Sequence, residues 1–169
     1  EAGAVVLNLK DEEALKLAVE KMRIDVTAYD ADAASELFLV EAMSPNPVAE
    51  LIINLRQDPQ FGAALVLGSG GVLVELMADT ATLLLPTSPA DIIRALKSLR
   101  VRRLLEGFRG RPAVDIPKVA EEIYKLCIAY QNHGKTITEI EINPLFVYRD
   151  TVSAIDALIQ VPVDTKHNF

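Results

Sequence analysis

The fold is decided by the stretch EIEINPL, residues 139–145, in which polar and apolar residues alternate. Alternation with a period of two predicts a strand that has one face on a core and the other in solvent. We expect Ile140 and Ile142 to face the core. The polar residues of the stretch then share the opposite face: Glu139, Glu141 and Asn143.

A second alternating stretch, VSAIDALI at residues 152–159, forms the other half of a predicted hairpin. We expect its core face to carry Ile155, Ala157 and Ile159. The opposite face then combines a carboxylate with apolar side chains: Val152, Ala154, Asp156 and Leu158. A carboxylate in such surroundings is costly unless it is paired or binds a metal.

A two-residue loop at residues 149–150 would place Asn143 directly opposite Asp156 in this hairpin. Directly opposed residues share a face, with Cβ atoms about 5 Å apart. An amide oxygen and a carboxylate so placed can hold a hard cation such as Mg²⁺, with phosphate oxygens completing the shell. Arg-Asp is not a favoured two-residue turn, and Pro144 indicates a bulge. The alternative is an ordinary polar-faced strand that ends at an Asn-Pro turn.

The composition limits the class of protein. The chain has 169 residues, of which 50% are hydrophobic and 24% charged, as is typical of a globular protein. Its net charge of −7, without a basic stripe, argues against a nucleic-acid partner. A nucleotide would need metal and local donors, because the overall field repels phosphates. The single cysteine, Cys127, excludes a disulfide framework, and we therefore expect a cytoplasmic protein. No apolar run reaches membrane-spanning length, so no membrane partner is expected.

The other predicted elements lack the regular strand–helix–strand repeat of a parallel sheet. Strands are predicted at residues 4–9, 37–43, 48–57, 64–67, 72–77 and 82–85. Helices are predicted near residues 11–22, 89–99 and 116–132, with Asp11, Ser88 and Asp115 as caps. A polar loop is expected at residues 25–35. The fold class is therefore α+β, with a mainly antiparallel sheet and flanking helices.

Two glutamates and a glycine-rich segment are candidate ligand contacts. Glu41 and Glu50 lie on predicted strands, where solvent-facing carboxylates are the ordinary explanation. The segment Gly68-Ser69-Gly70-Gly71 joins two apolar strands, and its N–H groups could form a nest for an anion. The alternative is a tight hairpin loop without a ligand.

Several motifs resemble one family, the nucleoside-diphosphate-forming acyl-CoA synthetases, which includes ADP-forming acetyl-CoA synthetase and is related to succinyl-CoA synthetase. EINPL at 141–145 followed by IDA at 155–157 resembles the end of its ATP-grasp domain. The run from DPQFG at 58–62 through residues 70–79 is also similar, as is the pair Arg109-Gly110. The resemblance covers roughly residues 5–161, and residues 162–169 are expected to form a tail or linker.

The resemblance implies an incomplete ATP-grasp lobe at residues 1–161 that binds ATP or ADP with Mg²⁺. The positions that match Asn143 and Asp156 bind the metal in this family, and Glu141 matches a residue close to the transferred phosphoryl group, which makes it the catalytic candidate. The implied nucleotide contacts are Val40, Glu41, Met43, Glu50, Gly70 and Gly71.

The implied activity couples an acyl-CoA thioester to ADP phosphorylation, or the reverse, through a phosphohistidine. His133 and His167 match no phosphoryl-carrying position. The expected partners are therefore the remaining ATP-grasp lobe and the CoA-binding and ligase domains or subunit, and the chain alone is expected to be inactive. Ala4 and Leu158 replace a glycine and a basic residue of the family. These departures support a rival hypothesis, a degenerate ATP-grasp module with a regulatory or binding role, fused to another activity such as a protein acetyltransferase.

Overall fold

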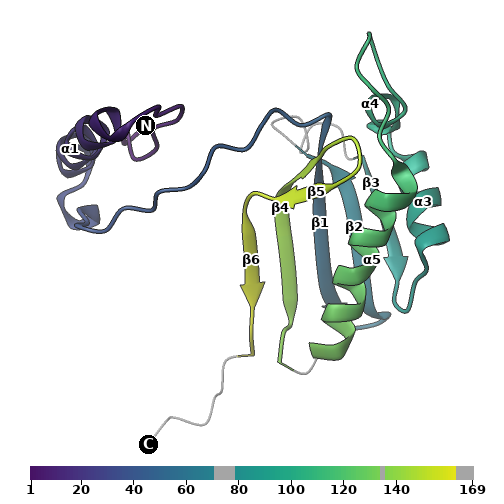
Figure 1. The fold of residues 1–169 in the computed structure, drawn as a ribbon. Coiled ribbons are helices and arrows are strands. Elements are labelled where there is room, and N and C mark those ends of the chain that lie inside the picture. Colours follow the sequence, from purple (N-terminus) through teal and green to yellow (C-terminus); the bar gives the residue numbers. More distant parts are fainter. Residues whose placement is uncertain (71–78, 134–135, 163–169) are drawn as a thin grey trace, which may run out of the picture. The chain divides into compact units, whose positions relative to one another are not determined.

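The computed structural model describes residues 1–70, 79–133 and 136–162 (Figure 1). Contacts between residues divide the chain into two compact units, Glu1–Asn46 and Pro47–Phe169, and each is described by itself. None of the described helices combines the length and the apolarity that crossing a membrane needs.

The first unit is built on helix α1, Glu12–Tyr29, followed by the short 3₁₀ helix η1, Ala31–Ala33. The predicted cap is confirmed, because the carboxylate of Asp11 accepts a hydrogen bond from the Ala14 N–H at 2.8 Å. The helix continues beyond the predicted end into the segment expected to be a loop. Ion pairs one turn apart, such as Lys21 with Asp25, stabilise a helix through such a polar stretch.

The strands predicted at residues 4–9 and 37–43 do not form. All of residues 1–46 are described, and none of them belongs to a strand. Most of the apolar side chains that suggested strands are exposed; Leu37 and Leu39 are 87% and 85% exposed. A strand needs a neighbour to satisfy its backbone groups, so alternation in the sequence was not sufficient here.

The described residues of the second unit form a six-stranded sheet in which every pairing is antiparallel. Its strands are β1 Ala49–Asp58, β2 Gly62–Ser69, β3 Thr80–Leu84, β4 Glu139–Val147, β5 Val152–Ala154 and β6 Ala157–Gln160. The spatial order is β3-β2-β1-β4-β5, and β6 also pairs with β4. The predicted α+β class with a mainly antiparallel sheet is confirmed, whereas the strand expected at residues 72–77 lies outside the described residues.

The described residues of this unit also form three helices: α3 Pro89–Ser98, α4 Arg102–Leu105 and α5 Ile116–His133. The predicted caps form, because the Ser88 hydroxyl accepts from the Asp91 N–H at 3.2 Å and the Asp115 carboxylate from the Lys118 N–H at 3.2 Å. Helices α3 and α5 lie against the same face of the sheet (Figure 1). The polar residues of the strands are therefore concentrated on the other face.

The core lies between that sheet face and the helices. Its fully buried side chains include Leu51, Ile53, Leu65, Leu96, Ile123 and Tyr130. Cys127 is also fully buried, and burial raises the pKa of its thiol to about 11. The thiol is therefore protonated at neutral pH, which confirms the prediction that Cys127 is a core residue and not a nucleophile.

Asp79 joins the end of the sheet to the turn before α4. Its carboxylate accepts hydrogen bonds from the Arg100 N–H at 2.8 Å, from the Val101 N–H at 3.3 Å and from the Ser69 hydroxyl. Partial burial alone would raise the pKa of Asp79. These hydrogen bonds and the positive charge of Arg100 outweigh burial and hold the pKa below its ordinary value of 3.8.

We expect Asp79→Asn to lower the free energy of unfolding by about 2 kcal/mol at pH 7, because an amide nitrogen would then face backbone N–H donors. A carboxyl whose folded pKa is depressed stabilises the fold above its unfolded pKa and loses that contribution as the pH falls through the folded value. The difference between the two proteins should therefore shrink below about pH 4. Urea unfolding at pH 7 and pH 3 measures it, with Glu121→Gln on the exposed side of α5 as the control. An equal difference at both pH values would contradict the electrostatic explanation.

Candidate functional site

One face of the sheet, here called the acidic face, carries most of the predicted site residues. The side chains of Leu51, Ile53 and Leu55 are fully buried on the helix-covered side of β1. Because successive residues of a strand point to opposite faces, Glu50 and Asn54 project from the other side. We define the acidic face by its polar residues: Glu50, Asn54, Glu139, Glu141, Asn143 and Asp156.

The hairpin that contains Asn143 and Asp156 has the predicted register. Leu145 pairs with Ala154 and Val147 with Val152, on either side of a tight turn. The same register continues in β6, where Ile142 pairs with Ala157. Between these pairs the Asn143 N–H donates to the carbonyl oxygen of Asp156 at 3.1 Å. The two residues therefore lie directly opposite each other on neighbouring chain segments.

A bulge interrupts β4 within this hairpin. Ile142 and Leu145 are both buried although two residues separate them, and the pairing of β4 with β1 shifts by one residue between Leu51 and Ile53. Pro144 has no N–H to donate, which explains why the ladder is interrupted at this position. The bulge places both Asn143 and Pro144 on the acidic face.

The bulge also corrects part of the predicted face assignment. Val152 was expected beside Asp156, but it lies opposite the buried Val147 and packs against the core. Ile155 was expected to face the core, but it is 37% exposed. The prediction extended one alternation through residues 152–159, whereas the strand is broken opposite Pro144. Ala157 lies opposite the buried Ile142, on the predicted face, but it is exposed, and Ile159, also predicted to face the core, is 55% exposed.

Glu141 lies at the centre of the acidic face. It pairs with Asn54 on β1 and with Leu158 on β6. Glu50 lies on the same face of β1, opposite Phe146. The structure thus brings together carboxylates from β1, from β4 and from the segment between β5 and β6. Asn54 was missed in the sequence, although it is the only polar residue within the apolar run LIINL at residues 51–55.

The amides of Ser69 and Gly70 are paired within the protein. The Ser69 N–H donates to the carbonyl oxygen of Asp79 at 3.1 Å, and the Gly70 N–H donates to that of Glu50 at 2.7 Å. A Cβ atom on Gly70 would lie 2.8 Å from the carbonyl carbon of Glu50. The close approach of these two backbones explains the glycine at position 70, and its contact with a nucleotide stays a prediction. Gly71 lies outside the described residues.

The other predicted nucleotide contacts belong to the first unit. Val40, Glu41 and Met43 follow η1 in a stretch without helix or strand, where all three are exposed. Their contact with a nucleotide stays a prediction.

The oxygen ligands of the acidic face have the chemistry that Mg²⁺ requires. Glu141 and Asp156 offer carboxylates and Asn143 an amide oxygen, and hard cations select such donors. Across residues 1–70, 79–133 and 136–162, no group of three or more His, Cys, Asp or Glu side chains is arranged to hold a metal ion. A metal held by Asn143 and Asp156 would therefore take its remaining ligands from phosphate oxygens or water.

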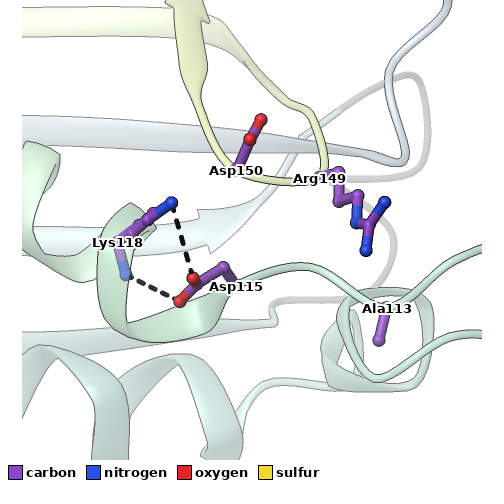
Figure 2. A pocket seen from close by; sticks show the side chains of 5 residues that line it. All are labelled: Ala113, Asp115, Lys118, Arg149 and Asp150. Carbon is purple, nitrogen blue, oxygen red and sulfur yellow. Dashed lines mark hydrogen bonds and ion pairs between the residues drawn. The ribbon is translucent and has the colours of Figure 1, made fainter.

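An open pocket of about 360 Å³ lies elsewhere, between the start of α5 and the turn that joins β4 to β5 (Figure 2). Its lining residues are Ala113, Asp115, Lys118, Arg149 and Asp150. The Asp115 N–H donates to the carbonyl oxygen of Arg149 at 2.6 Å, and the Lys118 ammonium lies 3.9 Å from the Asp115 carboxylate. None of the predicted site residues lines this pocket, and Asp115 already caps the helix there.

Arg109, in the pair Arg109-Gly110, has a left-handed backbone with a φ of 49°. Its guanidinium lies over the ring of Phe108, with 5.2 Å to the ring centroid. These contacts are local to the loop before α5 and assign no chemical role to the pair.

Comparison with known proteins identifies relatives of the chain. A family model for an ATP-grasp domain matches residues 1–161. The β subunit of ADP-forming acetate–CoA ligase II from Pyrococcus furiosus is 31% identical over 155 residues, which are 92% of this chain and 65% of that protein. The ADP-forming acetate–CoA ligase of Methanocaldococcus jannaschii is 32% identical over 89% of this chain, but only 21% of that protein is covered.

Solved structures agree with the sequence relatives. The dinucleotide-forming acetyl-coenzyme A synthetase 1 of Ca. Korarchaeum cryptofilum, in complex with coenzyme A and Ca-AMPCP, superposes with a TM-score of 0.84 at 32% identity over 95% of this chain and 69% of that one. Another structure of that enzyme, with Mg-AMPPCP, has a phosphohistidine segment pointing towards the nucleotide binding site, and superposes with a TM-score of 0.80 at 30% identity, over 95% of this chain and 69% of that one. The chain therefore spans about two thirds of the β subunits and about a fifth of the longer ligases.

Proposed function

The chain belongs to the ATP-grasp domain family, and on this basis we propose that it forms the nucleotide- and Mg²⁺-binding part of an ADP-forming acyl-CoA ligase. The observation that carries the proposal is the opposition of Asn143 and Asp156 across the hairpin, with Glu141 on the same face. Relatives that share this segment include ADP-forming acetate–CoA ligases and their β subunits.

In this proposal Asn143 and Asp156 hold the metal ion of the nucleotide. When bound, Mg²⁺ would neutralise phosphate charge during phosphoryl transfer. The bulge at Pro144 fixes the Asn143 side chain on the acidic face, and the backbone bond from Asn143 to Asp156 keeps both ligands on adjacent segments. Glu141, two residues before Asn143, is the carboxylate that we place nearest the transferred phosphoryl group, and Glu50 is placed at the edge of the nucleotide cleft. Val40, Glu41 and Met43 would contact the base, with Gly70 and Gly71 beside the nucleotide.

The proposed partners supply what this chain does not carry. The reaction would pass a phosphoryl group between the nucleotide and a histidine of the CoA-binding domain or subunit, as the phosphohistidine segment of the Korarchaeum enzyme suggests. Leu158 lies directly opposite Glu141 and is 56% exposed, so that position offers no cation to the phosphates. A lysine or arginine from the rest of the ATP-grasp fold would then have to balance the phosphate charge.

The exposed Leu158 is also the structural observation that favours the rival function, a degenerate module with a regulatory or binding role. The two functions differ in one property. A ligase needs Mg²⁺-dependent nucleotide turnover in the complete protein, whereas a degenerate module has none at any Mg²⁺ concentration.

We expect the isolated chain to bind Mg-ATP weakly, because it spans only about two thirds of the β subunits that it matches and its net charge of −7 repels a nucleotide. Calorimetric titration should show little heat at protein concentrations of about 0.1 mM, which corresponds to a Kd in the millimolar range. The titration is repeated with the complete protein and with EDTA. Tight, Mg²⁺-dependent, stoichiometric binding by the isolated chain would show that this segment suffices.

A further inference from the structure

Asn54 makes an unexpected contact across the acidic face. Its side-chain N–H donates to the carboxylate oxygen Oε1 of Glu139 at 2.6 Å. The residue directly opposite Glu139 on β1 is not Asn54 but Arg56, and Asn54 lies opposite Glu141. In the part of the chain that the structure describes, Glu139 nevertheless bonds to Asn54 and forms no ion pair with Arg56. The Glu139 carboxylate therefore reaches diagonally towards the pair of Asn54 and Glu141.

The orientation of the Asn54 amide is fixed by this contact. Rotating the amide by half a turn would place its carbonyl oxygen against the Glu139 carboxylate, and two acceptors repel each other. In the observed orientation the Asn54 oxygen Oδ1 is buried and has no hydrogen-bond partner among the described residues. A buried oxygen without a donor costs free energy. The Asn54 side chain thus donates a hydrogen bond to Glu139 while its own oxygen Oδ1 receives none from the described residues.

We propose that Asn54 is a positioning residue: it holds the Glu139 carboxylate against β1, so that Glu141 is the free carboxylate beside Asn143 and Asp156. This inference rests on the proposed function. It adds a residue that is not among the predicted site residues and acts through Glu139 without touching the substrate.

The restraint keeps the carboxylate of Glu139 apart from that of Glu141. Glu139 and Glu141 are two residues apart on one face of a strand, so their Cα atoms are about 7 Å apart. A second mobile carboxylate at that distance would repel the nucleotide phosphates and compete with them for Mg²⁺. The amide of Asn54 donates a charge-assisted hydrogen bond to the Glu139 carboxylate and so keeps it in one position.

The proposal is tested by replacing Asn54 in the complete ligase, once with the native Glu139 and once with Glu139→Gln. Asn54→Ala should raise the KM for Mg-ATP, and the Mg²⁺ concentration for half-maximal turnover, by about 10-fold, the equivalent of one charge-assisted hydrogen bond. In a Glu139→Gln background, which has no carboxylate to restrain, the same change should alter both values by less than about 2-fold. A rise of equal size in both backgrounds, or no rise in either, would overturn the proposal.

If Asn54→Ala does not fold, a second set of variants, in which donor and acceptor are exchanged between positions 54 and 139, tests the same proposal. Asn54→Asp has the size of the native side chain but places a second carboxylate against Glu139, and should raise the KM for Mg-ATP at least as much. Adding Glu139→Gln exchanges donor and acceptor, and should return the KM to within about 3-fold of the native value. If the double variant is as impaired as Asn54→Asp, Asn54 does not act through Glu139. The native ligase is measured first, because absent Mg²⁺-dependent turnover would refute the proposed function and not the role of Asn54.

Discussion

Asp156→Asn in the complete ligase should lower Mg²⁺-dependent turnover by about 100-fold or more and leave the fold intact. Loss of even an indirect metal contact commonly costs 10- to 100-fold, and the proposal makes Asp156 a direct ligand. The fold does not depend on the carboxylate, because Asp156 is exposed and its backbone oxygen, not its side chain, accepts the bond from Asn143. The replacement also has the same size.

Initial rates and circular dichroism of the variant measure this prediction. The matched control is Asp150→Asn, an exposed aspartate in the turn of the same hairpin, which should change turnover by less than about 2-fold. Native-like turnover in Asp156→Asn at saturating and at limiting Mg²⁺ would remove Asp156 from the metal site. Equal losses of turnover in both variants would indicate that removing any negative charge from the hairpin lowers turnover, and that Asp156 has no specific role.

Gly70→Ala should lower the free energy of unfolding by about 3 kcal/mol, the combined cost of overpacking and of a lost backbone hydrogen bond. The added Cβ would lie 2.8 Å from the carbonyl carbon and 2.9 Å from the Cβ of Glu50, where the backbone has to move. The N–H of Gly70 would then lose its 2.7 Å bond to the Glu50 oxygen. Because Glu50 lies on the acidic face, nucleotide binding should weaken as well.

Urea unfolding compares this variant with Gly110→Ala. A Cβ on Gly110 would meet no atom within 4 Å, so that variant carries only the cost of a left-handed backbone at φ +81°, about 1 kcal/mol. A smaller loss for Gly70→Ala than for Gly110→Ala would show that the contact between Gly70 and Glu50 is not close in solution.

The sequence predicted the part of the site that depends on local rules. A two-residue loop determines the register of a hairpin, so the opposition of Asn143 and Asp156 followed from counting residues. The caps Asp11, Ser88 and Asp115 likewise depend only on the first turn of each helix. Family resemblance added the proposed nucleotide, ATP or ADP, which the pattern alone did not indicate.

The errors arose where a remote neighbour decides the outcome. Residues 4–9 and 37–43 alternate like strands, but the described first unit offers them no strand to pair with. Val152 changed faces because Pro144, on the opposite strand, interrupts the ladder. Asn54 appeared to be one polar residue in an apolar run, and its role depends on Glu139, which is 85 residues away in the sequence.

The central claim is that Asn143 and Asp156 serve one metal ion, and the Mg²⁺ dependence of turnover tests it most directly. The measurement compares the native ligase with Asp156→Asn, Asn143→Ala and the double variant across a range of Mg²⁺ concentrations. Each single variant should raise the Mg²⁺ concentration for half-maximal turnover by about 10-fold or more, and the double variant should fall well short of the product of the two effects. Unchanged Mg²⁺ dependence in Asp156→Asn, or fully additive effects in the double variant, would contradict the account and leave the hairpin a purely structural element.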